Sequence, residues 1–95
     1  MSRVVRMPRL GANEESARLV HWSKRAGDLV RPTEVICEVE TTKAVVEVEA
    51  EAHGYLRPIA QIDSLVPTGE VLAIVTETAD EDYLPLLKAA AQPLP

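Results

Sequence analysis

The chain repeats itself at an offset of 36 residues, and this repeat is the strongest constraint on its fold. The segment LVRPTEVICEVETT at residues 29–42 aligns without a gap on LVPTGEVLAIVTET at residues 65–78, with six identities in fourteen positions. Average composition would give roughly one identity. The repeat predicts two similar units packed with approximate two-fold symmetry. The copies differ at Lys43, whose equivalent in the second copy is Ala79.

Short β-type segments, separated by Gly, Pro and Asp, run through both copies of the repeat. Short strands at this spacing, without helical segments between them, predict an all-β sandwich or barrel. The strands are expected at residues 3–7, 18–22, 34–41, 44–50, 55–59 and 70–78.

The segment EVETTKAVVEVEA at residues 38–50 predicts a β-hairpin whose tip is Thr42-Lys43. With a two-residue turn there, side chains alternate between two faces of the hairpin. A slip of one residue would mix the faces, so the pattern specifies the register and places Lys43 at the apex. One face is apolar, with the pairs Val39/Val46, Cys37/Val48 and Val35/Ala50, and the other carries Glu38, Glu40, Glu47 and Glu49.

Glu34 and Glu51 raise to six the number of carboxylates around this hairpin. Glu38 is expected directly opposite Glu47, and a like-charge pair of this kind costs some stability. Two interpretations stay open at this point. The carboxylates form either a solvated outer face or an acidic surface that helps to select partners.

The C-terminal segment DEDYLPLLKAAAQPLP, residues 80–95, departs from the β pattern. Asp80 or Asp82 is expected to cap one helical turn, which Pro85 would weaken. The closing AAAQPLP is typical of a semi-rigid linker. We therefore expect one domain over residues 1–79, followed by the start of an Ala/Pro linker or a short tail over residues 80–95.

The charge and composition exclude several classes of function. The net charge is −5 with a pI near 4.9, so no basic patch is available to neutralise nucleic-acid phosphates. Cys37 is the single cysteine, which excludes an internal disulfide and fits a reducing compartment. No apolar run approaches the roughly 20 residues of a membrane helix, and the N-terminus lacks the features of a secretory signal. These features predict an intracellular protein without a membrane partner.

Side chains capable of catalysis or metal binding are present but lack the required context. His21, His53 and Cys37 do not have metal-ligand spacing, so we expect structural roles for them and no metal site. The serines, among them Ser23 and Ser64, lack a nucleophile elbow or a triad, and no Gly-rich phosphate loop is present. The chain alone is therefore expected to have no turnover.

Six segments resemble, in order, the lipoyl domains of 2-oxoacid dehydrogenase complexes: MPRL, LVHW, GDLV, EVICEVETTKAVVEVEA, GYL and VPTGEVLAIV. The resemblance covers about residues 4–77. Its strongest part is Glu40-Thr41-Thr42-Lys43-Ala44, which is similar to the family's E-T-D-K-A lipoylation motif. Two residues depart from the family pattern. Thr42 stands where the family usually has Asp, and Ser16 stands where it commonly has Gly.

The resemblance implies a fold, a cofactor and a set of partners. The fold would be a flattened barrel of two four-stranded antiparallel sheets related by a quasi-two-fold axis. Lys43 would be joined by an amide bond to lipoic acid, the work of a lipoate ligase or lipoyl transferase. The arm would serve a thiamine-diphosphate 2-oxoacid decarboxylase, an acyltransferase core and a dihydrolipoyl dehydrogenase, in the bacterial cytoplasm or the mitochondrial matrix. The loop expected to recognise the decarboxylase, or merely to connect two strands, comprises Gly11, Ala12, Asn13, Glu14, Glu15 and Ser16.

The leading hypothesis is therefore the lipoyl carrier domain of a dihydrolipoamide acyltransferase component. A biotin carrier of the same fold is a second hypothesis, although biotin carriers typically flank their lysine with Met, and here the neighbours are Thr42 and Ala44. A third is an unmodified β-sandwich interaction module that has lost its arm, for which Thr42 is the best argument. The first two predict covalent modification of Lys43, and the third predicts none.

Overall fold

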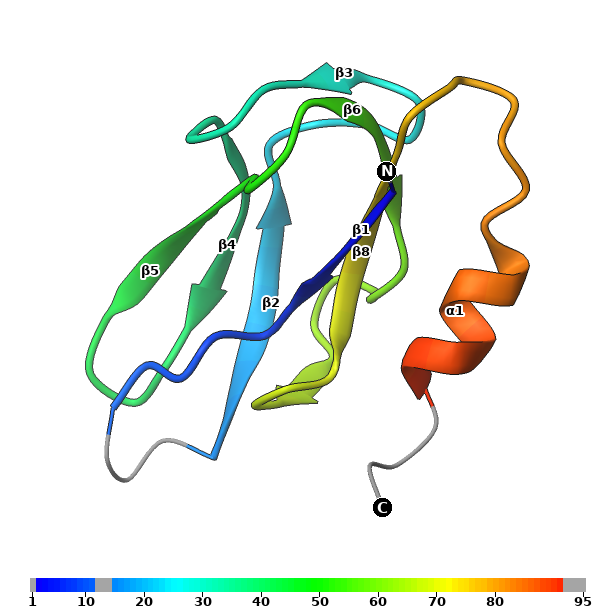
Figure 1. Cartoon of the computed structure of the whole chain (residues 1–95). Coiled ribbons are helices and arrows are strands. Elements are labelled where there is room, and N and C mark those ends of the chain that lie inside the picture. Colours follow the sequence, from blue (N-terminus) through cyan, green and yellow to red (C-terminus); the bar gives the residue numbers. More distant parts are fainter. Residues whose placement is uncertain (1, 12–14, 92–95) are drawn as a thin grey trace.

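The computed structural model describes residues 2–11 and 15–91, which form two sheets and one helix (Figure 1). The strands and the helix are β1 (Arg3–Arg6), β2 (Ser16–Trp22), β3 (Leu29–Val30), β4 (Val35–Glu40), β5 (Val45–Glu49), β6 (Gly54–Pro58), β7 (Leu65–Pro67), β8 (Val71–Thr76) and α1 (Leu84–Ala91).

Two four-stranded antiparallel sheets pack face to face, which confirms the expected fold class. One sheet has the strand order β1-β8-β6-β3 and the other the order β5-β4-β2-β7. The offset of 36 residues carries β2, β3 and β4 onto β6, β7 and β8, so the two orders become identical when β5 is matched with β1. The predicted strands all form, with bounds that differ by one to a few residues. The alternation pattern missed β3 and β7, because each is too short to show it.

The quasi-symmetry extends to the irregular positions of the backbone. The β4–β5 register shifts between Val35 and Cys37, and the β1–β8 register shifts opposite Leu72. The extra residues, Ile36 and Leu72, are 36 positions apart and both are fully buried. Each is the additional residue of a β-bulge, which changes the alternation of side chains locally.

The tight turns also recur at the offset of 36 residues. Gly27 and Asp63 both have positive φ, at 87° and 71°, and so do Thr33 and Gly69, at 72° and 90°. Equivalent amides also make equivalent hydrogen bonds, since the Thr33 N–H donates to the Ala50 carbonyl and the Gly69 N–H to the Met7 carbonyl, each at 2.9 Å. The two halves of the barrel therefore share the same backbone conformation at these turns.

The β4–β5 hairpin has the predicted register near its tip and a different one near its base. Glu40 pairs with Val45, Val39 with Val46, Glu38 with Glu47 and Cys37 with Val48, all as expected. At the base, Val35 pairs with Glu49 instead of Ala50. The bulge at Ile36 causes this shift, and it buries Ile36 while leaving Val35 only half-buried.

The core between the sheets is aliphatic, and both halves of the repeat contribute residues to it. It consists of buried Val, Leu, Ile and Ala side chains, with Met7 and Cys37 among them, and Trp22 packs against its edge. The Trp22 Nε1–H donates to the Ala60 carbonyl at 3.1 Å, so the half-buried indole is hydrogen-bonded. Most of the apolar face predicted for the hairpin, including Val39 and Val48, belongs to this core or packs against it, whereas Val35 does not.

The C-terminal segment is more regular than the sequence pattern indicated. A single helical turn was expected, whereas α1 spans eight residues, Leu84–Ala91, and includes the alanines assigned to the linker. The Leu84 N–H donates to Asp82 Oδ1 at 3.1 Å, so Asp82 caps the helix. Pro85 lies in the first turn, where its missing N–H has no intrahelical acceptor to lose, so it is compatible with the longer helix.

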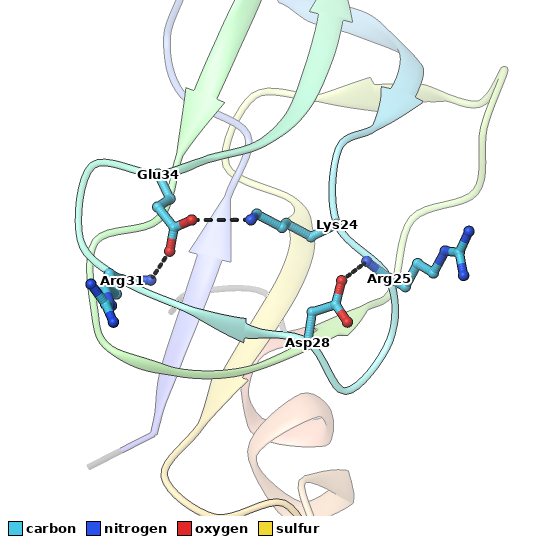
Figure 2. A network of polar contacts seen from close by, with 5 residues as sticks. All are labelled: Lys24, Arg25, Asp28, Arg31 and Glu34. Carbon is cyan, nitrogen blue, oxygen red and sulfur yellow. Dashed lines mark hydrogen bonds and ion pairs between the residues drawn. The ribbon is translucent and has the colours of Figure 1, made fainter.

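A polar network closes the loops around β3, at the base of the β4–β5 hairpin (Figure 2). Lys24 Nζ lies 3.0 Å from Glu34 Oε2, and the Arg31 N–H donates to Glu34 Oε1 at 2.7 Å. These two contacts, with Lys24 the larger contributor, lower the pKa of Glu34. The Arg25 N–H donates to Asp28 Oδ2 at 2.8 Å in the adjoining turn. The base of the hairpin is thereby fixed at the end opposite Lys43.

Candidate functional site

Lys43 occupies the bend between β4 and β5, at the tip of the hairpin, and its side chain is exposed. The sequence prediction of an apical lysine agrees with this geometry. Within residues 2–11 and 15–91, no carboxylate forms an ion pair with the Lys43 ammonium. An exposed amine without such a partner is accessible to another protein.

The Thr41 hydroxyl holds the bend together. Thr41 Oγ1 accepts hydrogen bonds from the N–H groups of Lys43 and Ala44, both at 3.1 Å, and donates to the Ala44 carbonyl at 3.2 Å. The Thr41 N–H donates to the same carbonyl at 2.9 Å. A side-chain oxygen thus replaces a backbone carbonyl in closing the turn, which explains how Thr-Lys forms a hairpin tip without the usual Asn-Gly. Sequence reasoning identified Thr41 only as part of a motif.

The end of the β1–β2 loop lies beside this tip. Glu15 and Ser16, from the predicted recognition loop, line an open groove together with Glu40, Thr41 and Thr42. The Thr68 N–H donates to the Glu15 carbonyl at 2.8 Å and so ties the loop to the chain after β7. Gly11 does not line the groove, and Ala12, Asn13 and Glu14 lie outside the described residues.

A row of side chains crosses the outer face of the lysine-bearing sheet next to the bend. The backbone pairing Val45–Glu40–Arg18–Leu65 runs over all four strands, and all four residues are exposed. Val45 and Leu65, at 54 % and 67 % exposure, are large apolar side chains open to solvent. Sequence reasoning missed this part of the row. Leu65 lies on β7, a strand that was not predicted, and Arg18 on β2 becomes its neighbour only through the β2–β7 pairing. The neighbouring pair Glu38–Glu47 lies on the same face, as predicted.

The remaining candidate side chains do not gather into a site. His21 and His53 are both exposed, and the described residues contain no group of three or more His, Cys, Asp or Glu placed to hold a metal. Cys37 is fully buried, and desolvation, with a smaller contribution from Glu38, raises the pKa of its thiol to about 12. Such a thiol is protonated and unreactive at neutral pH. Among the described residues, no helix is long and apolar enough to cross a membrane.

Two quasi-symmetric four-stranded sheets with an exposed lysine at one hairpin tip define a carrier domain of the biotinyl/lipoyl class. A family model described as biotin-requiring enzyme matches residues 3–75. The solved lipoyl domain of the 2-oxoglutarate dehydrogenase complex from Azotobacter vinelandii superposes with a TM-score of 0.64 at 31 % identity, covering 78 % of this chain and 95 % of that domain. The chain belongs to this family, and it is a lipoyl domain of the kind found in the acyltransferase components of 2-oxoacid dehydrogenase complexes.

Longer relatives agree with this assignment. The chain is 39 % identical over 94 residues to component 3 of the mitochondrial pyruvate dehydrogenase acetyltransferase of Arabidopsis thaliana, covering 92 % of this chain and 17 % of that protein. It is 35 % identical over 83 residues to the 2-oxoglutarate dehydrogenase succinyltransferase component of Rickettsia typhi, covering 86 % of this chain and 21 % of that protein. The chain spans about a fifth of the length of these relatives.

Proposed function

We propose that Lys43 is the residue on which this domain carries its lipoyl group, in amide linkage, as the mobile arm of a 2-oxoacid dehydrogenase complex. The observation that supports this most directly is the geometry of the bend. Lys43 is exposed, lies at the tip of two paired strands, and has its own N–H held by Thr41. A biotin carrier would need the same geometry, so the residues around the lysine decide between the two.

The lipoyl group would be held by a covalent bond to the Lys43 side chain, so this role needs no further residues to bind it. Condensation of the Lys43 ammonium with the lipoate carboxylate, carried out by the ligase, forms the amide C–N bond, releases water and abolishes the charge of the lysine, so the four-carbon stem becomes an uncharged tether. The paired strands β4 and β5 keep the base of that tether clear of the domain surface. When bound, the lipoyl group supplies a dithiolane that takes up an acyl group together with two electrons.

The proposed partners follow from the family. They are a lipoate ligase or lipoyl transferase that modifies Lys43, a thiamine-diphosphate 2-oxoacid decarboxylase, an acyltransferase core and a dihydrolipoyl dehydrogenase. The groove beside the bend, lined by Glu15, Ser16 and Thr42, is the proposed contact for the decarboxylase. We propose the bacterial cytoplasm or the mitochondrial matrix as the location, and the relatives that match include both mitochondrial and bacterial proteins.

Intact mass of the whole chain tests the attachment. The chain is produced with lipoate and lipoate ligase, and separately with biotin and biotin ligase. We expect a lipoyl increment that Lys43→Arg abolishes and Lys88→Arg retains, since Lys88 is another exposed lysine, on α1. A biotin increment would favour the biotin carrier, an unmodified chain in both preparations would favour the interaction module, and a lipoyl increment surviving in Lys43→Arg would refute the assignment.

A further inference from the structure

The outer faces of the two sheets differ, although the repeat makes their backbones equivalent. On the lysine-bearing sheet, Glu38 and Glu40 point outward. The offset of 36 residues places Ile74 and Thr76 at the equivalent positions of β8, and both are fully buried. Ile74 does not belong to the core cluster between the sheets. Its burial therefore needs a cover on the outer side of its sheet.

The segment after β8 provides that cover. Figure 1 shows α1 lying along β1 and β8, and the helix contacts both strands. Its Leu86 and Leu87 are half-buried, whereas Leu84 is exposed. A helix that docks one side on a sheet and leaves the other in solvent shows this distribution.

Polar contacts hold residues 79–83, the first part of this cover, against Arg57 on β6 and Ser2 at the start of the chain. The Arg57 guanidinium lies 5.7 Å from the centre of the Tyr83 ring, and Arg57 Nη2 donates to the Ala79 carbonyl. Ser2 Oγ donates to a carboxylate oxygen of Glu81. These contacts come from β6 and from the residue before β1, so two segments distant in sequence hold the approach to α1.

The end of α1 is held at the end of the barrel that carries the lysine bend (Figure 1). Arg6 on β1 donates through Nη1 to the Gly69 carbonyl at 2.7 Å and through Nη2 to the Ala90 carbonyl at 3.3 Å. A cation on the last carbonyls of a helix also suits its dipole. Gly69 follows Thr68, whose N–H donates to Glu15, and Glu15 lines the groove beside the lysine bend. The helix thus runs back toward the end of the barrel that carries the lysine bend.

We propose that residues 77–91 form an intramolecular cap on the outer face of sheet β1-β8-β6-β3, and that this cap turns the chain so that it leaves the domain at the lysine end. Without the cap, the chain would leave at the end of β8, where Thr76 pairs with Tyr55. The cap depends only on contacts among these residues and holds whatever group Lys43 carries. If the proposed function also holds, a tether that begins at the lysine end of the domain affects the arm's effective concentration at its targets.

NMR on the unmodified full chain tests the cap. Docking predicts backbone order parameters near ~0.85 for residues 84–90, as in rigid structure, whereas a linker gives values below ~0.6. A nitroxide on Ala89→Cys should broaden the Gly69 amide more strongly than the Gly27 amide. The buried thiol of Cys37, with its raised pKa, stays unlabelled in the folded chain.

Two matched substitutions on the helix separate docking from helix formation. Leu87→Ser, at a half-buried position, should lower the order parameters and abolish the extra broadening at Gly69, whereas Leu84→Ser, at a position 54 % exposed, should preserve both. Low order parameters in the parent chain, equal broadening at Gly69 and Gly27, or equal effects of the two substitutions would each overturn the cap. None of these readings depends on whether Lys43 can be lipoylated.

Discussion

Replacing Thr41 by Val should destabilise the hairpin that carries Lys43, because it removes the hydroxyl that closes the bend. Val has nearly the shape of Thr, so packing changes little and the loss is one of hydrogen bonding. Thr41 Oγ1 accepts from two N–H groups and donates to one carbonyl. Each such bond contributes about 0.5–1.5 kcal/mol net, and full loss of three would cost roughly 1.5–4.5 kcal/mol.

The exposure of the bend sets the value near the lower end of that range. Thr42, Lys43 and Ala44 are exposed, so water can pair with the released N–H groups. We therefore expect Thr41→Val to lower the free energy of unfolding by about 1–2 kcal/mol. With a urea m-value of about 1–3 kcal/mol/M for a small domain, the midpoint should fall by about 1 M.

Urea titration followed by Trp22 fluorescence measures this effect, since Trp22 is the single tryptophan and lies at the edge of the core. Thr41→Ser is the matched control, because Ser keeps the hydroxyl and should unfold within ~0.5 kcal/mol of the parent. The two variants should also differ in the rate of modification at Lys43, with Thr41→Val slower. Equal midpoints for Thr41→Val and Thr41→Ser would show that the hydroxyl does not hold the bend.

Two further predictions concern positions where the backbone limits the side chain. Gly54→Ala should destabilise the fold by about 3 kcal/mol, because the added Cβ would collide with the Thr76 carbonyl oxygen and lie 2.7 Å from Val75 Cγ1. Thermal unfolding measures this effect, and an unchanged midpoint would contradict the close approach of the two strands. Thr33→Gly should stabilise the fold by up to about 1 kcal/mol, because a β-branched residue at φ 72° is strained. Gly69→Ala, at the equivalent position with φ 90° and open space around the added Cβ, should destabilise it by a similar amount. Stability changes of the same sign in the two variants would refute this.

The two-fold fold and the lysine hairpin could be predicted because both depend on regular patterns. The repeat required equivalent units, and the alternation of apolar residues with Glu near the hairpin tip specified four of the observed backbone pairs. The bulge at Ile36 could not be predicted in the same way. An apolar residue inserted in an apolar run leaves no break in the pattern, yet it moves Val35 out of register with Ala50.

Other features were missed because their physical signal is tertiary. The strands β3 and β7 have two and three residues, so neighbouring strands define them more than their own sequence does. The second half of the groove, with Arg18 and Leu65, became visible only when β7 took its place beside β2. The role of Thr41 depends on one side-chain rotamer in the bend. Its position in a recognised motif indicated importance without indicating the mechanism.

The outer faces show how a duplicated unit acquires two different surfaces without losing its fold. The inward positions remain alike, since Val39 and Val75 occupy the same place in the two copies and both are buried. Outward positions do not contribute to the shared core, so they can diverge at little cost to it. In one copy they carry Glu38 and Glu40 on the lysine-bearing sheet, and in the other they carry Ile74, fully buried on a strand that α1 contacts. Reading the repeat for its differences as well as its identities would have indicated from sequence that β8 requires an outer cover and β4 does not.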